Sequence, residues 1–320
     1  MISKEFSKEN KTFKAVIICG PTGSGKSSLA MDLGAQFGGQ IISADSRQIY
    51  RRLDIGTAKP TVEDRAKIPH HMIDVADVAE NFTAKQYAEM TSEIIERINR
   101  IGSVPLIVGG AGLYLSALTN GLFEGPPRDE NLRAQFAERI RQYGLYSLHA
   151  ELAQIDPNSA IYIPPSDSVR IIRALEVFKL TGKPMTELKT NGQYINLDAE
   201  YLWLGLNYPR DILYERIDQR VDSMIETGLI DEVQGLVRDG LGSILKIKKI
   251  VGYFEIIDAL EGAISIDEAI LLVKQHSRNY AKRQLTWFRH KAQVQWINPE
   301  NNHFLDEMKI KLDEFLGKMS

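Results

Sequence analysis

Eight residues near the start of the chain form a motif that binds phosphate. Residues 20–27 read GPTGSGKS and match the pattern G-x-x-x-x-G-K-[ST] at every fixed position. Glycines let the backbone wrap closely around phosphate oxygens and direct its N–H groups at them. Lys26 supplies a mobile positive charge, and the Ser27 hydroxyl can bind Mg²⁺. The expected phosphate-binding residues are Gly20, Pro21, Thr22, Gly23, Ser24, Gly25, Lys26 and Ser27.

The motif alone does not identify the reaction. A loop of this kind can serve phosphoryl transfer, in which phosphorus is attacked. It can equally hold a diphosphate that departs when carbon is attacked, because both reactions need the negative charge on phosphate oxygens to be neutralised. The spacing of the motif leaves both reactions open.

A candidate general base is Asp45, which directly follows a second apolar segment. In open α/β sheets, ligands bind outside the carboxyl ends of the strands, so Asp45 is expected to face the same crevice as the phosphate-binding loop. A carboxylate there can accept a proton or hold Mg²⁺ through water. The structural alternative is that Asp45 caps a helix N-terminus.

Short apolar segments alternate with helical patterns along the chain. Such alternation predicts a parallel sheet with helices on both faces. The predicted strands are Ala15–Cys19, Ile41–Ser43, Leu106–Val108, Tyr201–Leu206 and Val294–Ile297, and helical patterns include Ser27–Phe37 and Ala84–Arg100. With the phosphate-binding motif, the predicted fold is α/β with a P-loop NTPase-like parallel sheet.

The middle of the chain reads differently, because helix-like stretches at 129–143 and 167–180 occur without a convincing strand. We therefore expect a helical domain at 121–199, inserted into a catalytic core formed by residues 1–120 and 200–320. Residues 265–268 have capping-box spacing and predict a long basic helix that runs through Arg289.

Composition indicates a globular protein. Of the 320 residues, 43% are hydrophobic and 25% are charged, near globular averages. The single cysteine, Cys19, excludes an intramolecular disulfide and fits a reducing cytoplasm. Residues 103–123 carry no formal charge over a membrane-spanning length, but their proline and glycines favour a strand followed by a loop. We expect no membrane helix.

Segments along roughly residues 15–290 resemble those of the tRNA dimethylallyltransferase family, also called tRNA isopentenyltransferases. They occur in the order found in that family. The matching segments are 20–30 (GPTGSGKSSLA), 45–60 (DSRQIYRRLDIGTAKP), 70–74 (HHMID), 108–114 (VGGAGLY), 170–177 (RIIRALEV), 220–233 (RVDSMIETGLIDEV), 252–255 (GYFE) and 281–289 (AKRQLTWFR).

The resemblance implies transfer of a dimethylallyl group from dimethylallyl diphosphate to N6 of adenosine 37 in tRNA, with Mg²⁺ as cofactor and diphosphate as product. It implies that Lys26 and Arg220 bind the diphosphate and that Asp45 accepts the N6 proton. Without the family resemblance, Arg220 is expected on a solvated helix surface. The inserted domain is expected to contact the anticodon arm, and no obligate protein partner is inferred.

Basic residues interleaved with aromatics predict RNA contacts, although each cluster alone also suits a hydrated helix face. Residues 278–291 contain several such residues and no acidic one. Gln48 can read a base edge or make a turn hydrogen bond. The expected tRNA-binding residues are Asp45, Ser46, Arg47, Gln48, Ala111, Arg170, Arg173, Lys249, Arg278, Lys282 and Arg283.

Four positions depart from the family pattern. Ala111 stands where threonine is usual, which removes one hydrogen bond worth about 0.5–1.5 kcal/mol. Ser166, Val169 and Lys249 also differ from the usual residues. Because these positions surround the expected RNA contacts, they bear on substrate preference more than on the fold.

Three alternatives remain. The phosphate-binding loop alone favours a nucleoside or nucleotide kinase. The resemblance also allows prenylation of free AMP or ADP, and the departure at Ala111 favours an RNA-binding protein without activity. The neighbouring His70 and His71 suggest a metal site, but no accompanying ligand set is evident, so structural roles are expected.

Overall fold

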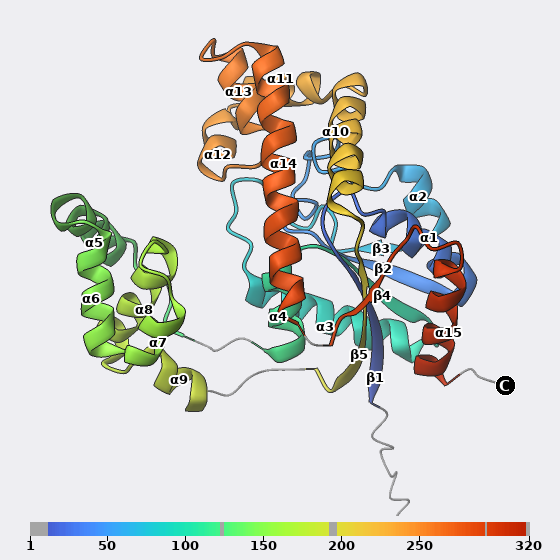
Figure 1. The fold of residues 1–320 in the computed structure, drawn as a ribbon, viewed down its shortest axis with the longest axis horizontal. Coiled ribbons are helices and arrows are strands. Elements are labelled where there is room, and N and C mark those ends of the chain that lie inside the picture. The colour runs from blue at the N-terminus through green and yellow to red at the C-terminus, as the bar shows by residue number, and fades with distance from the viewer. Residues whose placement is uncertain (1–11, 122–124, 192–196, 292, 318–320) are drawn as a thin grey trace, which may run out of the picture. The chain divides into compact units, whose positions relative to one another are not determined.

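The computed structural model describes residues 12–121, 125–191, 197–291 and 293–317 (Figure 1). Its contacts divide the chain into two compact units. The first comprises Met1–Thr119 and Asn196–Ser320, and the second comprises Asn120–Ile195. The phosphate-binding loop and Asp45 both belong to the first unit.

A six-stranded sheet forms the centre of the first unit, with the strand order β3-β2-β4-β1-β5-β6. Every neighbouring pair is parallel, so the carboxyl ends of all six strands lie at one edge. The strands are β1 (Phe13–Cys19), β2 (Gly39–Ala44), β3 (His70–His71), β4 (Val104–Gly109), β5 (Ala199–Leu206) and β6 (Gln295–Ile297).

Helices cover both faces of this sheet, because consecutive strand residues point to opposite sides. Ile17 packs into a cluster with residues of α3 (Ala84–Arg100) and α4 (Gly112–Asn120), whereas Ile18 packs against α1 (Lys26–Phe37) and α15 (Phe304–Leu316). Both isoleucines are fully buried. The predicted parallel sheet with helices on both faces is confirmed.

Further helices of the first unit follow β2 and β5 along the chain. Ser265 accepts a hydrogen bond from Glu268 N at 3.2 Å, which confirms the predicted start of the long helix α14. That helix packs against α10 and α13 (Figure 1). These helices are α2 (Val62–Lys67), α10 (Arg210–Glu226), α11 (Leu229–Arg238), α12 (Gly242–Ile247), α13 (Phe254–Leu260) and α14 (Ile266–Arg289).

The second unit is helical throughout its described residues. Phe136, Leu148, Leu152 and Leu175 belong to its hydrophobic core, which is made of residues from this unit alone. Two of its helices match predicted stretches, and α7 and α9 are too short for a clear periodic pattern. Helix α6 was missed, although its Leu145, Leu148, Leu152 and Ile155 have helical spacing. The helices are α5 (Glu130–Tyr143), α6 (Leu145–Ile155), α7 (Pro157–Tyr162), α8 (Ser168–Thr181) and α9 (Met185–Asn191).

The loop predicted after the third strand is wrong, because Gly112–Asn120 forms helix α4. Glycine is needed at position 112 because another side chain packs closely there, not because a regular element ends there. A Cβ atom at this position would lie 2.4 Å from the Trp287 ring. Strand β3 was not predicted because it has only two residues. In the described part of the chain, no helix combines the length and apolar character needed to cross a membrane.

A buried carboxylate holds the second unit together. Glu176 on α8 is 0% exposed and accepts hydrogen bonds from Arg133 at 2.7 and 2.9 Å, from Arg173 at 2.7 Å and from Asp129 N at 3.0 Å. Burial alone raises the pKa of Glu176, but the hydrogen bonds from Arg133 and Arg173 outweigh it and lower the pKa to about 2.

We predict that Glu176→Gln lowers the free energy of unfolding by about 3 kcal/mol in urea denaturation, because two arginines lose their shared anion. The contribution of Glu176 is present above its ordinary pKa of 4.5 and is lost as the pH falls through about 2. Glu138→Gln is the matched control, since its salt bridge to Arg141 is exposed and worth under about 1 kcal/mol. Equal losses in the two variants would contradict the assignment.

Candidate phosphate-binding site

The phosphate-binding loop leaves β1 and enters α1, and its backbone is shaped by three glycines. Gly20, Gly23 and Gly25 have φ values of 143°, 80° and 79°, in the region that favours glycine. A Cβ at position 20 would also lie 2.9 Å from the Leu206 carbonyl oxygen. The N–H groups of Gly23, Gly25, Lys26 and Ser27 make no hydrogen bond to other described residues. They are therefore available to an anion at the start of α1.

Lys26 is a half-buried cation in this loop. Its Nζ donates to the Pro21 carbonyl oxygen at 2.5 Å and to Ser24 Oγ at 3.4 Å. Burial lowers the pKa of Lys26 to about 8, and the neighbouring Arg220 adds to this effect while Asp45 opposes it. A bound anion would stabilise the protonated Lys26 against both burial and the repulsion from Arg220. The loop therefore favours a negatively charged ligand.

Asp45, Lys26 and Arg220 face one hollow of about 60 Å³. Arg220 comes from α10, and its Nη2 donates to the Thr57 carbonyl oxygen at 3.4 Å. Asp45 Oδ1 accepts from Arg47 N at 2.8 Å and from Gln48 N at 3.4 Å, so Asp45 closes a turn as well as facing the hollow. The alternative that Asp45 caps a helix is wrong, because the next helix, α2, begins only at Val62. The turn uses only Oδ1, so Oδ2 is left for a chemical role.

Gln284 and Tyr280 on α14 also line the hollow, and no pattern in the sequence indicated them. Gln284 is buried. Its Oε1 accepts from Thr22 N at 2.8 Å and its Nε2 donates to the Gly110 carbonyl oxygen at 3.1 Å. This amide thus connects the phosphate-binding loop to the end of β4. The Thr22 N–H, which we expected to bind phosphate, donates to Gln284 instead.

A second cavity, of about 210 Å³, shares Thr22, Asp45, Arg220 and Tyr280 with the hollow. Its wall carries three further cations, Arg47, Lys249 and Arg283. In the described part of the chain these three cations have no carboxylate within 4.0 Å, the ion-pair distance. A second anion such as an RNA phosphate suits this wall.

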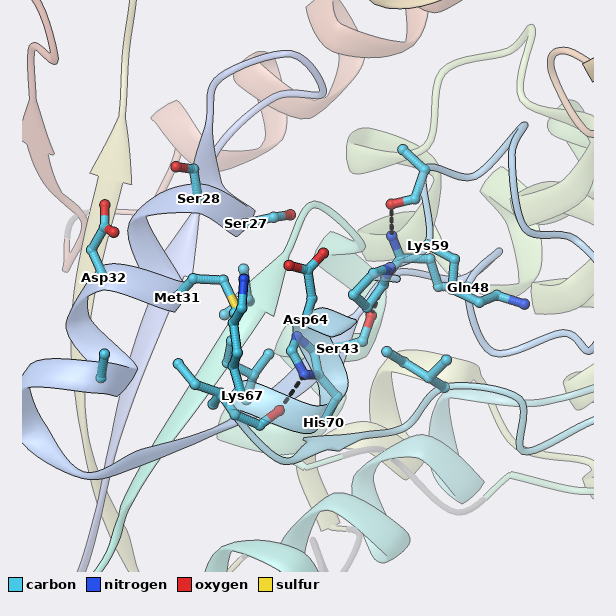
Figure 2. A pocket seen from close by; sticks show the side chains of 17 residues that line it. Ser27, Ser28, Met31, Asp32, Ser43, Gln48, Lys59, Asp64, Lys67 and His70 are labelled. Atoms are coloured by element: carbon cyan, nitrogen blue, oxygen red, sulfur yellow. Dashed lines mark hydrogen bonds between the residues drawn. The ribbon is translucent and has the colours of Figure 1, made fainter. Parts of the chain in front are cut away.

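A third cavity, of about 700 Å³, is lined in part by Ser27 and Ser28 at the start of α1 (Figure 2). It shares Ser27, Gln48 and Val108 with the hollow. In Figure 2 the Ser43, Gln48 and Lys59 side chains border one part of it and His70 and Lys67 another. Its apolar lining comes from Met31, Ala35, Ile41, Ile68, Ile73 and Val108.

Several expected RNA-binding residues are held by other protein groups. Arg278 binds both oxygens of Asp218 at 2.5 and 2.7 Å, Arg170 Nε binds Asp167 at 2.6 Å, and Arg173 binds Glu176. Both hydrogens of the Gln48 amide go to carbonyl oxygens, those of Thr57 and Ala58. The partner of Arg278 lies 60 residues away in the chain and gave no signal in the sequence. Asp167 and Glu176 are each three residues from their arginines, and this spacing on a helix could have indicated the pairs.

The remaining expected residues differ in exposure. Lys282 and Arg283 line an open groove on α14 together with Trp287 and His290. Ala111 is buried in the core cluster beside Tyr114, and Ser46 is half-buried after Asp45. Whether any of these residues contacts tRNA stays a prediction.

The Ser27 hydroxyl fits the expected metal, because it is exposed at the wall of the hollow and makes no hydrogen bond within the described residues. No group of three or more His, Cys, Asp or Glu side chains suited to a metal occurs in that part of the chain. His70 Nδ1 pairs with the Ile68 carbonyl oxygen and His71 Nε2 with Gln40, which agrees with structural roles.

A parallel α/β sheet that carries this loop, with a cationic hollow at the carboxyl ends of its strands, defines a P-loop protein that binds a diphosphate or triphosphate. The model of the IPP transferase family matches residues 48–291. The tRNA dimethylallyltransferase of Geobacter metallireducens is 45% identical over 290 residues, which cover 91% of this chain and 94% of that protein.

Solved structures agree with this match. The full-length tRNA isopentenylpyrophosphate transferase of Bacillus halodurans is similar with a TM-score of 0.70 and 38% identity, over 95% of this chain and 97% of that one. A eukaryotic dimethylallyltransferase acting on tRNA has a TM-score of 0.79 at 25% identity, over 96% and 80% of the two chains. The chain belongs to the IPP transferase family, and the predicted family is confirmed.

We predict that inorganic pyrophosphate binds the wild-type protein more weakly as the pH rises through about 8, where Lys26 loses its proton. Above this pKa the affinity should fall about tenfold per pH unit relative to Lys26→Arg, which keeps its charge. Calorimetry from about pH 7 to about pH 9.5 measures the difference, and the ionisation of pyrophosphate itself is common to both proteins. Parallel pH profiles would show that Lys26 does not bind the anion.

Proposed function

We propose that this protein transfers a dimethylallyl group from dimethylallyl diphosphate to N6 of adenosine 37 in tRNA and releases diphosphate. The observation that carries this proposal is the convergence of Lys26, Arg220 and Asp45 on one hollow beside the phosphate-binding loop. Relatives named tRNA dimethylallyltransferase support the substrate pair. Because tRNA is a cytoplasmic substrate, we also propose that the protein acts in the cytoplasm.

The loop and its cations bind the leaving group. The free N–H groups of residues 23 and 25–27 would donate hydrogen bonds to the oxygens of the donor's diphosphate, and Lys26 would turn from Pro21 to the same anion. As the carbon–oxygen bond of the donor breaks, negative charge grows on the diphosphate. Lys26 and Arg220 stabilise that charge, and a Mg²⁺ bound by Ser27 and phosphate oxygens would supply further positive charge.

Asp45 addresses the weakness of the nucleophile. The exocyclic amine of adenine is a poor nucleophile because its lone pair is delocalised into the ring. As N6 bonds to the donor carbon, it becomes more acidic and must lose a proton. Asp45 lies in the wall shared by the hollow and the 210 Å³ cavity, so its carboxylate is placed to accept that proton.

The two larger cavities suit the two substrates. The 210 Å³ cavity carries Arg47, Lys249 and Arg283, which match the phosphates of an RNA loop that presents one unstacked base. The 700 Å³ cavity shares Ser27 with the hollow, and its wall combines apolar side chains, which suit a prenyl group, with charged ones that include Asp32, Asp64 and Lys67. Both substrates would then reach the hollow through cavities that share lining residues with it.

The alternative predictions have less support. A nucleoside kinase disagrees with the family to which the chain belongs. An RNA-binding protein without activity was suggested by Ala111, but Lys26, Asp45 and Arg220 all face the hollow. Ala111 itself packs in the core cluster, so its missing hydroxyl leaves these three groups in place.

The proposal is tested by incubating the purified protein, Mg²⁺ and labelled dimethylallyl diphosphate with tRNA that carries adenosine 37. Mass analysis of the tRNA nucleosides should show one N6-dimethylallyladenosine, with equimolar release of diphosphate. Free AMP and ADP serve as competing acceptors in parallel reactions. Label on the free nucleotides and none on tRNA would overturn the proposed acceptor.

We predict that Asp45→Asn lowers the rate of transfer about 10²–10⁴-fold, because the amide cannot accept the N6 proton. The amide oxygen can still accept the Arg47 and Gln48 N–H groups, so the turn and the affinity for tRNA should change little. Single-turnover kinetics measure the first effect and filter binding the second. An active Asp45→Asn protein would remove the proposed base.

A further inference from the structure

Arg220 is held in place by the backbone of one loop, Leu53–Lys59. Its Nη2 donates to the Thr57 carbonyl oxygen, which also accepts a hydrogen bond from Gln48 Nε2 at 3.1 Å. Gly56 and Thr57 line the same cavity as Arg220. The direction in which Arg220 points therefore depends on where this loop places the Thr57 carbonyl group.

The loop is itself anchored by Glu232 on α11, which lines none of the cavities described above. Glu232 Oε2 accepts from Asp54 N at 3.2 Å and from Ile55 N at 2.7 Å, and Oε1 accepts from Gly56 N at 3.3 Å. A carboxylate bound to three consecutive backbone N–H groups is a strong, charge-assisted arrangement.

Tyr253, the residue directly before α13, completes this anchor. Its hydroxyl donates to Glu232 Oε1 at 2.6 Å, and its ring lies against Gly56, where a Cβ would come within 2.5 Å of a ring carbon. Tyr253 is fully buried. The next residues towards the N-terminus, Lys249–Gly252, line the cavity that contains Arg220. One carboxylate therefore fixes two segments of the cavity wall.

Other contacts, which do not involve Glu232, also hold the Leu53–Lys59 loop. Lys59 Nζ donates to the Tyr50 carbonyl oxygen at 2.9 Å and to carboxylate oxygens of Asp54 and Asp74, both at 2.6 Å. Thr57 Oγ1 donates to the Leu53 carbonyl oxygen at 2.6 Å. Removing the Glu232 charge should therefore shift the 54–57 backbone without unfolding the loop.

We infer that Glu232 is a positioning residue for Arg220, which acts through the Asp54–Thr57 backbone and is itself oriented by the Tyr253 hydroxyl. This rests on the proposed function only in assigning a diphosphate to Arg220. Glu232 does not touch the diphosphate, so its removal changes anion binding only when Arg220 is present.

A double-mutant cycle tests this inference, with inorganic pyrophosphate as the probe and calorimetry as the readout. Glu232→Gln keeps the side-chain shape but presents an amide N–H₂ group to N–H donors. In the wild-type background it should weaken pyrophosphate binding about tenfold, within the range of coupling in one hydrogen-bond network. In an Arg220→Ala background the same change should weaken binding less than about twofold.

Two variants control for general effects. Asp231→Asn removes an equal charge from the neighbouring exposed position of α11 and should leave the affinity unchanged. Tyr253→Phe keeps the ring against Gly56 and should show a smaller loss than Glu232→Gln, again only with Arg220 present. A purely structural role would lower the binding stoichiometry or the thermal midpoint instead, with an unchanged dissociation constant.

The outcomes separate this inference from the proposed function. Equal losses from Glu232→Gln in both backgrounds, no loss in either, or no binding of pyrophosphate by the wild-type protein would overturn the positioning role. The double-mutant cycle could show coupling between Glu232 and Arg220 while the protein transfers no prenyl group to tRNA. That result would overturn the proposed reaction but not the positioning role of Glu232.

Discussion

Positive charge concentrated in a small half-buried hollow is the constraint on which this structure depends. Lys26 and Arg220 repel each other there, and among the described residues that line the hollow only Asp45 carries negative charge. The rest of the unit keeps these cations close together, and a bound anion stabilises them by lowering their repulsion. The same two cations would stabilise the negative charge of a departing diphosphate.

The scaffold fixes this hollow from segments far apart in the chain. The parallel sheet brings the ends of β1, β2 and β4 to one edge, which places the phosphate-binding loop near Asp45. Helix α14 adds Gln284, whose amide joins Thr22 to Gly110, and α10 adds Arg220. The hollow is thus assembled from elements that are distant in the chain, which fits preorganised electrostatic stabilisation.

The sequence predicted the features that short patterns encode. The motif at residues 20–27, the two-sided burial of β1 and the cap at Ser265 are local, and all are present in the structure. Gln284, Tyr280 and Glu232 were missed because their roles depend on partners in other segments. For the same reason Arg278 was expected to face RNA, although Asp218 binds it. Arg173 was expected there too, although Glu176, three residues along the same helix, binds it. Charge along the chain does not reveal which cations are paired in space.

The most direct test of this account is a crystal structure of the protein with an anticodon stem-loop and an inert thio-bridged analogue of dimethylallyl diphosphate. The account predicts phosphate oxygens on the N–H groups of residues 23 and 25–27, contacts from Lys26 and Arg220 to the same diphosphate, and an Asp45 oxygen about 3 Å from N6 of the unstacked adenosine. A diphosphate bound elsewhere, or an adenosine whose N6 lies out of reach of Asp45, would contradict it.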